Sequence, residues 1–288
     1  MTEGLPRRRL LRLAAAAGLG LAALMDADRV RVAARVEGAF ADRPVRPRIG
    51  SAAAARHLAS FRRAVAAMRA LPTSDPRNWT RQAQLHNEHG PHASWLFLPW
   101  HRAYLFCFES ICRELSGDSA FALPYWDWSS DPSIPAEFFE APLSYEVRDA
   151  SRSVRADPAF VGAGALAAIL DEPNFLVMGG PAATEQYGPG YGLVEQGPHH
   201  HVHGLVGGTM GTLMSPLDPI FWAHHGRLDR LWVEWNLDRD HPLPDSDDWW
   251  RTEFTEFVDG TGRPVRVSMA TVALMPLVAY RYDTQAAR

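Results

Sequence analysis

The sequence of 288 residues has few cysteines, no excess of positive charge and no long apolar run beyond its first 25 residues. Its two cysteines, Cys107 and Cys112, lie five residues apart on one apolar segment, a poor geometry for a disulfide, so we expect two small buried hydrophobic side chains. The formal net charge of −4 and the lack of a basic patch interleaved with aromatic residues argue against nucleic-acid binding. The 10 Trp and 13 Phe instead favour a compact aromatic interior.

The N-terminus carries the pattern of an export signal. The run Arg-Arg-Arg-Leu-Leu-Arg at residues 7–12 precedes an apolar stretch at 13–25 that is too short to span a bilayer. It resembles the twin-arginine signal of bacteria, which predicts a periplasmic or secreted protein with a signal segment at 1–27 and one domain at 28–288. Residues 25–27, Met-Asp-Ala, match a cleavage site poorly, so removal of the segment stays open, as does the alternative of a basic surface helix.

Apolar periodicity predicts a mainly helical domain with long loops. Aromatic and proline-rich sequence at 124–142 and glycine-rich sequence at 179–197 indicate loops. Short peripheral strands are expected at 265–267 and within 272–282. The expected helices cover residues 51–71, 79–85, 95–115, 165–170, 199–205 and 218–236.

Ten of the 12 histidines lie within two short windows, 86–101 and 199–225. His199 and His203 are four residues apart, so on a helix their rings share one face and can bind one metal ion. Neutral imidazoles without thiolates or carboxylates suit copper, although histidine alone does not exclude zinc. The predicted ligands of two metal ions are His86, His92, His101, His199, His203 and His225.

Two segments with these histidines, residues 92–102 and 218–229, closely resemble the two copper signatures of the tyrosinase and catechol oxidase (polyphenol oxidase) family. The likeness extends from about residue 45 to 282. It implies a four-helix bundle around a dinuclear type-3 copper centre, with two copper ions as cofactor and O2 as co-substrate. It also implies oxidation of o-diphenols to o-quinones and, in tyrosinases proper, hydroxylation of monophenols. Family members pack a Tyr-x-Tyr element, here residues 280–282, on an arginine, for which Arg46 is the candidate.

The resemblance assigns roles to further residues. Glu195 matches a glutamate that holds a water able to take the phenolic proton, and His200 stands where many monophenol-oxidising relatives have Asn, so His200 is a second candidate catalytic base. Gly90 replaces a cysteine that several relatives link to the second ligand, so no thioether is expected. The residues expected to contact the ligands without binding the metal are Phe221, His224 and Asp229. Asp229 would hold a ring nitrogen or fix its helix against a neighbour.

Other functions stay open at this point. An o-aminophenol oxidase or a pathway-specific phenol hydroxylase would use the same centre, and a haemocyanin-like O2 carrier shares the signatures, although a single domain without repeats argues against it. A hydrolytic zinc or non-haem iron site is a third alternative. The expected partners are a small phenolic substrate and a candidate copper chaperone acting in trans, with no nucleic acid and no stable membrane span.

Overall fold

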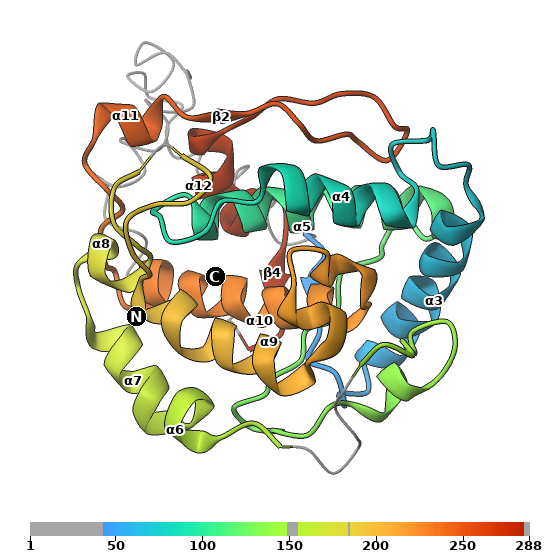
Figure 1. Ribbon diagram of the computed structural model, residues 1–288, viewed down its shortest axis with the longest axis horizontal. Coiled ribbons are helices and arrows are strands. Elements are labelled where there is room, and N and C mark those ends of the chain that lie inside the picture. The colour runs from blue at the N-terminus through green and yellow to red at the C-terminus, as the bar shows by residue number, and fades with distance from the viewer. Residues whose placement is uncertain (1–42, 149–154, 184, 285–288) are drawn as a thin grey trace, which may run out of the picture.

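The computed structural model describes residues 43–148, 155–183 and 185–284 (Figure 1). The predicted signal segment at 1–27 lies outside these residues. The described chain is mainly helical with long loops and short peripheral strands, as the sequence predicts. Six of its helices are α3 (Ala54–Ala70), α4 (Trp79–His89), α5 (Phe97–Ser116), α9 (His200–Val206), α10 (Ile220–Val233) and α12 (Met269–Val278).

Further helical segments lie between these helices, and one of them corrects the predicted extent of the glycine-rich loop. The loop expected to reach residue 197 ends earlier, because a π-helical turn covers Glu195–His199 and leads directly into α9. The other pieces are α6 (Pro158–Val161), α7 (Ala163–Asp171), α8 (Phe175–Met178), α11 (Asp247–Trp250), a second π turn at Glu234–Asp238 and 3-10 turns at Ala136–Phe139, Gly208–Gly211 and Ser215–Leu217.

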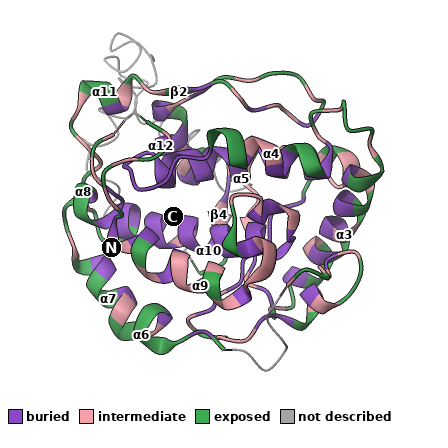
Figure 2. Cartoon of the chain, in the orientation of Figure 1, coloured by how far each residue is buried: buried purple, intermediate pink, exposed green. Residues whose placement is uncertain are grey.

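The four helices α4, α5, α9 and α10 form the centre of the molecule, and α3 packs along the outer side of α5 (Figure 1). Burial follows this arrangement, since α10 is almost wholly buried and α5 is buried over most of its length, whereas the outer faces of α3, α6 and α7 are exposed (Figure 2). Phe108 of α5 stacks face to face on Trp222 of α10, so aromatic packing joins the two central helices. Among the described residues, no helix combines the length and the apolar character that crossing a membrane requires.

The described strands form two small two-stranded sheets. Strand β1 (Val45–Arg46) pairs in parallel with β4 (Arg281–Tyr282), and β2 (Glu253–Phe254) pairs antiparallel with β3 (Val267–Ser268). Of the segment 272–282, where short strands were expected, only Arg281–Tyr282 forms a strand, because most of it forms α12. Its sequence is rich in Ala, Met and Leu, which favour helix, and the Ser268 hydroxyl caps the first turn by accepting the Thr271 amide.

A buried ionic cluster joins β1 and β4 to the central helices. Arg46 forms ion pairs with Glu109 of α5 at 2.7 Å and with Asp229 of α10 at 2.9 Å. Its guanidinium lies 3.6 Å from the ring centre of Tyr280, and it donates to the Tyr282 hydroxyl. The predicted packing of the Tyr-x-Tyr element on Arg46 is therefore confirmed.

Candidate metal centre

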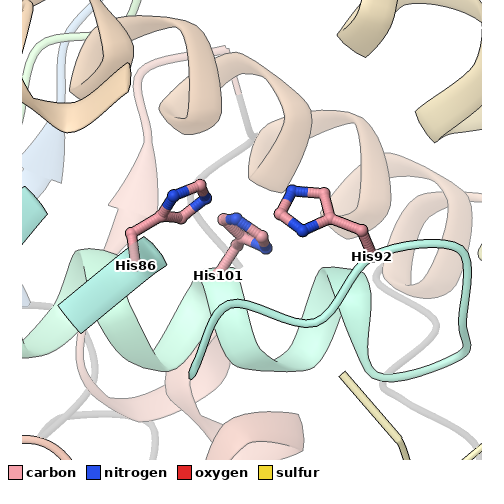
Figure 3. Close-up of side chains that lie close together, drawn as sticks. All are labelled: His86, His92 and His101. Carbon is pink, nitrogen blue, oxygen red and sulfur yellow. The ribbon is translucent and has the colours of Figure 1, made fainter. Parts of the chain in front are cut away.

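The first histidine group is assembled from α4, α5 and the loop between them. His86 comes from the last turns of α4, His101 from the second turn of α5, and His92 from the connecting loop. Their rings turn towards one another (Figure 3), and one nitrogen of each lies within 4.8 Å of the others. All three side chains are buried. Three imidazoles thus converge on one point.

The second group is assembled from the π turn, α9 and α10. His199 ends the π turn, His203 lies one turn along α9, and His225 comes from α10, with ligand nitrogens again within 4.8 Å of one another. The Nε2 atoms of His203 and His225 are 3.2 Å apart. Two nitrogens bound to one tetrahedral ion at about 2 Å would be separated by roughly 3.3 Å.

Backbone carbonyls fix the tautomer of most of these rings. Where Nδ1–H donates to a carbonyl, the lone pair lies on Nε2 and faces the centre of the group. The Nδ1 atoms are bonded to carbonyl oxygens in His86 (Leu213, 2.6 Å), His92 (Gly90, 3.0 Å), His101 (Phe97, 2.8 Å) and His203 (Met210, 2.6 Å). Within the described residues, Nε2 of His86 and His101 and both nitrogens of His199 are buried without a hydrogen-bond partner. Such orphaned nitrogens fit metal ligands.

The rings are neutral at physiological pH. Burial lowers the pKa of His86 to about 3 and the pKa values of His92 and His203 to about 4. Burial also lowers the pKa values of His101, His199 and His225 well below the usual range for histidine. Unprotonated imidazoles are the form that binds a metal ion.

The two groups adjoin. The rings of His101 and His225 stack at 4.5 Å, and those of His92 and His199 are 5.9 Å apart. Phe221 contacts His225 at 4.2 Å, as expected of an apolar support. Phe97 lies 4.7 Å from both His101 and His199 and was missed from the sequence, although it precedes His101 by one helical turn. The arrangement can hold two metal ions side by side in an apolar surround.

Glu195 lies beside the second group. Its side chain is buried, and both carboxylate oxygens accept from the Ala93 amide, at 3.0 and 2.9 Å. Its carboxylate also comes within 4.8 Å of nitrogens of His199 and His200. Burial raises the pKa of Glu195 to about 8, against the opposing effect of the Ala93 amide. A group with such a pKa can exchange a proton near neutrality.

The remaining predicted residues lie around these groups. His200 is partly exposed and contacts Tyr191 at 4.5 Å edge to face. His224 is buried and accepts from the Trp128 indole at 3.2 Å. Asp229 accepts from Arg102 and from both tyrosines of the 280–282 element, so it fixes α10 to its neighbours.

Gly90 leaves no room for a side chain. A Cβ atom at this position would lie 2.7 Å from the carbonyl oxygen of His86 and 3.0 Å from its ring. The glycine therefore allows the His92 loop to pass directly over the end of α4.

A helical bundle that brings six neutral imidazoles together in two adjoining groups of three is the architecture of a protein that binds two metal ions side by side. Comparison with known proteins narrows the class. The family described as the common central domain of tyrosinase matches residues 76–163 and 177–238. The chain belongs to the tyrosinase family, and its histidine groups fit the type-3 dicopper centre of that family, for which O2 is the co-substrate.

Individual relatives support the assignment to the tyrosinase family. The chain is 31% identical to the latent form of a chloroplastic polyphenol oxidase from Prunus armeniaca, over 79% of this chain and 46% of the relative. It is 27% identical to tyrosinase HcTyr1 from Hahella sp. (strain CCB-MM4), over 78% of this chain and 60% of the relative. The chain thus spans about half the length of the curated relatives it matches.

Solved structures support the same relationship. The crystal structure of Grenache (Vitis vinifera) polyphenol oxidase superposes with a TM-score of 0.74 at 27% identity, covering 86% of both chains. A functional unit of octopus haemocyanin, at 20% identity and a TM-score of 0.60, shares the fold alone.

Proposed function

We propose that this protein uses O2 to oxidise o-diphenols to o-quinones at a dicopper centre. His86, His92 and His101 would hold one copper ion, and His199, His203 and His225 the other. The observation that carries the proposal is the convergence of six neutral imidazoles, five of them buried and His203 partly exposed, in two adjoining groups within a chain of the tyrosinase family. Oxidation of two diphenols to two quinones supplies the four electrons that reduce one O2 to two waters.

The chain's own contribution is positioning and exclusion of water. The carbonyls of Phe97, Leu213 and Met210 hold imidazole rings with Nε2 facing inward. Phe97 and Phe221 pack directly on the histidine rings and keep the centre apolar. Bound copper would supply the redox chemistry with O2, and these contacts leave the protein little reorganisation to make during turnover.

Glu195 and His200 are the proposed proton acceptors for phenolic substrates. Each lies beside His199, and each has a pKa below that of a phenol. A carboxylate or imidazole next to the centre can take the phenolic proton, through a water in the case of Glu195. This step matters most for monophenols, whose hydroxylation begins with loss of that proton.

The test of the function is oxygen uptake by copper-loaded protein on catechol, L-DOPA, tyrosine, tyramine and 2-aminophenol side by side. We expect the catechols to be oxidised fastest. Turnover of 2-aminophenol alone would instead identify an o-aminophenol oxidase, and turnover of none of the five would refute the proposal.

A variant separates hydroxylation from oxidation. If His200 takes the phenolic proton, His200→Asn should change the ratio of tyramine to catechol turnover by about tenfold or more, because general-base catalysis contributes that much or more to a proton transfer. An unchanged ratio would remove His200 from the mechanism.

We further propose export through a twin-arginine route in a bacterium, with copper delivered by a chaperone in trans. Support comes from the arginine run at 7–12 and from the bacterial relative in Hahella. When the full-length sequence is expressed in a bacterial host, fractionation should show the protein outside the cytoplasm, and Arg8→Lys with Arg9→Lys should retain it inside. Equal export of both forms would refute the route.

A further inference from the structure

The loop at 185–192 is fastened across the first histidine group. The His92 amide donates to the Gln186 carbonyl at 2.7 Å, and the Gly188 amide donates to the His92 carbonyl at 2.9 Å. A Cβ atom at Gly188 would lie 2.1 Å from the Ala93 carbonyl oxygen, so only glycine permits this close approach. The loop therefore has a defined position relative to the metal centre.

Two tyrosines of this loop are half exposed and rest on histidines. Tyr187 is 51% exposed and stacks on His92, with ring centres 6.3 Å apart and an interplanar angle of 22°. Tyr191 is 52% exposed and meets His200 edge to face at 4.5 Å. His199 joins the two pairs, because its ring lies 5.9 Å from His92 and 5.1 Å from His200. The result is a continuous row of five rings with a tyrosine at each end.

The row borders the accessible side of the centre. Among the six proposed ligands, His92 is 8% exposed and His203 is partly exposed, whereas the other four are 1–4% exposed. These exposures point to approach of a phenol from the side of His92 and His203. Its reacting ring has to reach the metal ions held between the histidine groups. Tyr187 lies one ring contact beyond the ligand His92, and Tyr191 lies one contact beyond His200, which adjoins the ligand His199. The tyrosines would thus touch what projects from the reacting ring.

We propose that Tyr187 and Tyr191 are specificity-determining residues that select phenols carrying a second aromatic ring. The inference rests on the proposed function. Each tyrosine contacts a histidine ring while about half of its surface is exposed, which leaves aromatic surface for a substrate substituent. Aromatic pairs prefer stacked or edge-to-face contacts at ring-centre distances of about 4.5–7 Å, and an apolar substituent without a ring gains less from them.

The test compares two catechols that share the reacting ring. For each variant, kcat/KM is measured on 4-phenylcatechol and on 4-methylcatechol, normalised to bound copper. Tyr187→Leu and Tyr191→Leu should each lower the ratio of the two values by about two- to tenfold, and the double variant by more. Tyr187→Phe and Tyr191→Phe keep the ring and should keep the ratio.

Phe160→Leu is the matched control. Phe160 is 44% exposed and stacks on His201 at 4.6 Å, so it too is an exposed aromatic on a histidine of α9. His201 lies about 160° around the helix from His203 and binds the Asp157 amide, away from the centre. The ratio should not change in this variant.

The outcomes separate the two proposals. A wild-type protein that oxidises neither catechol would refute the proposed function and this inference with it. A wild-type protein that oxidises both, together with an unchanged ratio in the double Leu variant, would overturn only the proposal for Tyr187 and Tyr191. An equal fall of the ratio in the Phe variants would also overturn it, because the aromatic face would then not be what selects.

Discussion

At the scale of single residues, Gly90 shows how closely the backbone approaches the first histidine group. A methyl group at this position would lie 2.7 Å from the His86 carbonyl oxygen. We expect Gly90→Ala to lower stability by about 1–3 kcal/mol and to reduce copper binding, because α4 and the His92 loop must move apart. Thermal unfolding and copper content per chain measure both effects.

Gly164→Ala provides the control. Its Cβ would meet nothing within 4 Å, and it lies within α7. This change should leave copper content unaltered and raise stability slightly, since alanine favours helix over glycine. Equal copper content in both variants would contradict the steric argument for Gly90.

The cysteines make a second prediction at this scale. Cys107 and Cys112 are buried and free, and burial raises the pKa of Cys107 to about 12. A thiol with so high a pKa is unreactive near neutrality. Mass spectrometry of the copper-loaded protein should therefore find the peptide with His92 separate from both cysteine peptides. A linked pair, lighter by two hydrogens, would show a thioether.

At the scale of elements, an ion pair holds the loop after residue 126 on α10. Asp127 accepts from Arg227 at 2.7 Å, and the guanidinium lies over the Trp128 ring. Burial would raise the pKa of Asp127, but Arg227 and two serine hydroxyls lower it to about 2. The folded state thus binds this proton less tightly than the unfolded chain, whose pKa is near 3.8.

The pH dependence follows from that difference. Ionised Asp127 stabilises the folded state by roughly 2 kcal/mol. This contribution is complete above the unfolded pKa and is lost as pH falls through the folded pKa of about 2. Asp127→Asn should remove it, so urea unfolding of the variant should show a smaller loss of stability between pH 5 and pH 2.5. Parallel curves for the variant and the wild type would show that another carboxylate is responsible.

Elements also show what the sequence could predict. The helices of the bundle follow from apolar periodicity, because their buried faces are continuous, as on α5 with Phe97, Phe108 and Ile111. Short strands were expected within 272–282, but residues 272–278 are helical, because β-branched and apolar residues are compatible with either structure. The Ser268 cap and the packing of α12 against α5 select the helix. The packing is a tertiary contact, which the apolar periodicity of one segment cannot reveal.

At the scale of the whole molecule, the histidines that converge could be predicted from spacing and family resemblance, but what surrounds them could not. The carbonyls of Leu213 and Met210 that orient His86 and His203 have no side-chain signal. Tyr187 reaches His92 through a loop whose course depends on close backbone packing at Gly188. Such contacts join distant parts of the chain through backbone atoms, which residue identity does not mark.

Copper binding should stabilise the entire bundle, because the proposed ligands come from α4, α5, the π turn at Glu195–His199, α9, α10 and the loop at His92. The unfolded chain cannot hold six imidazoles in place, so each ion at a free concentration 100 times its Kd adds about 2.7 kcal/mol. Two such sites would raise Tm by roughly 10–20 °C in a chain of this size. Differential scanning calorimetry of metal-free and copper-loaded protein measures the shift. His101→Ala should lose most of it, whereas His89→Ala, a half-exposed histidine outside both groups, should keep it. A wild-type Tm that does not respond to copper would contradict the assignment of these histidines as ligands.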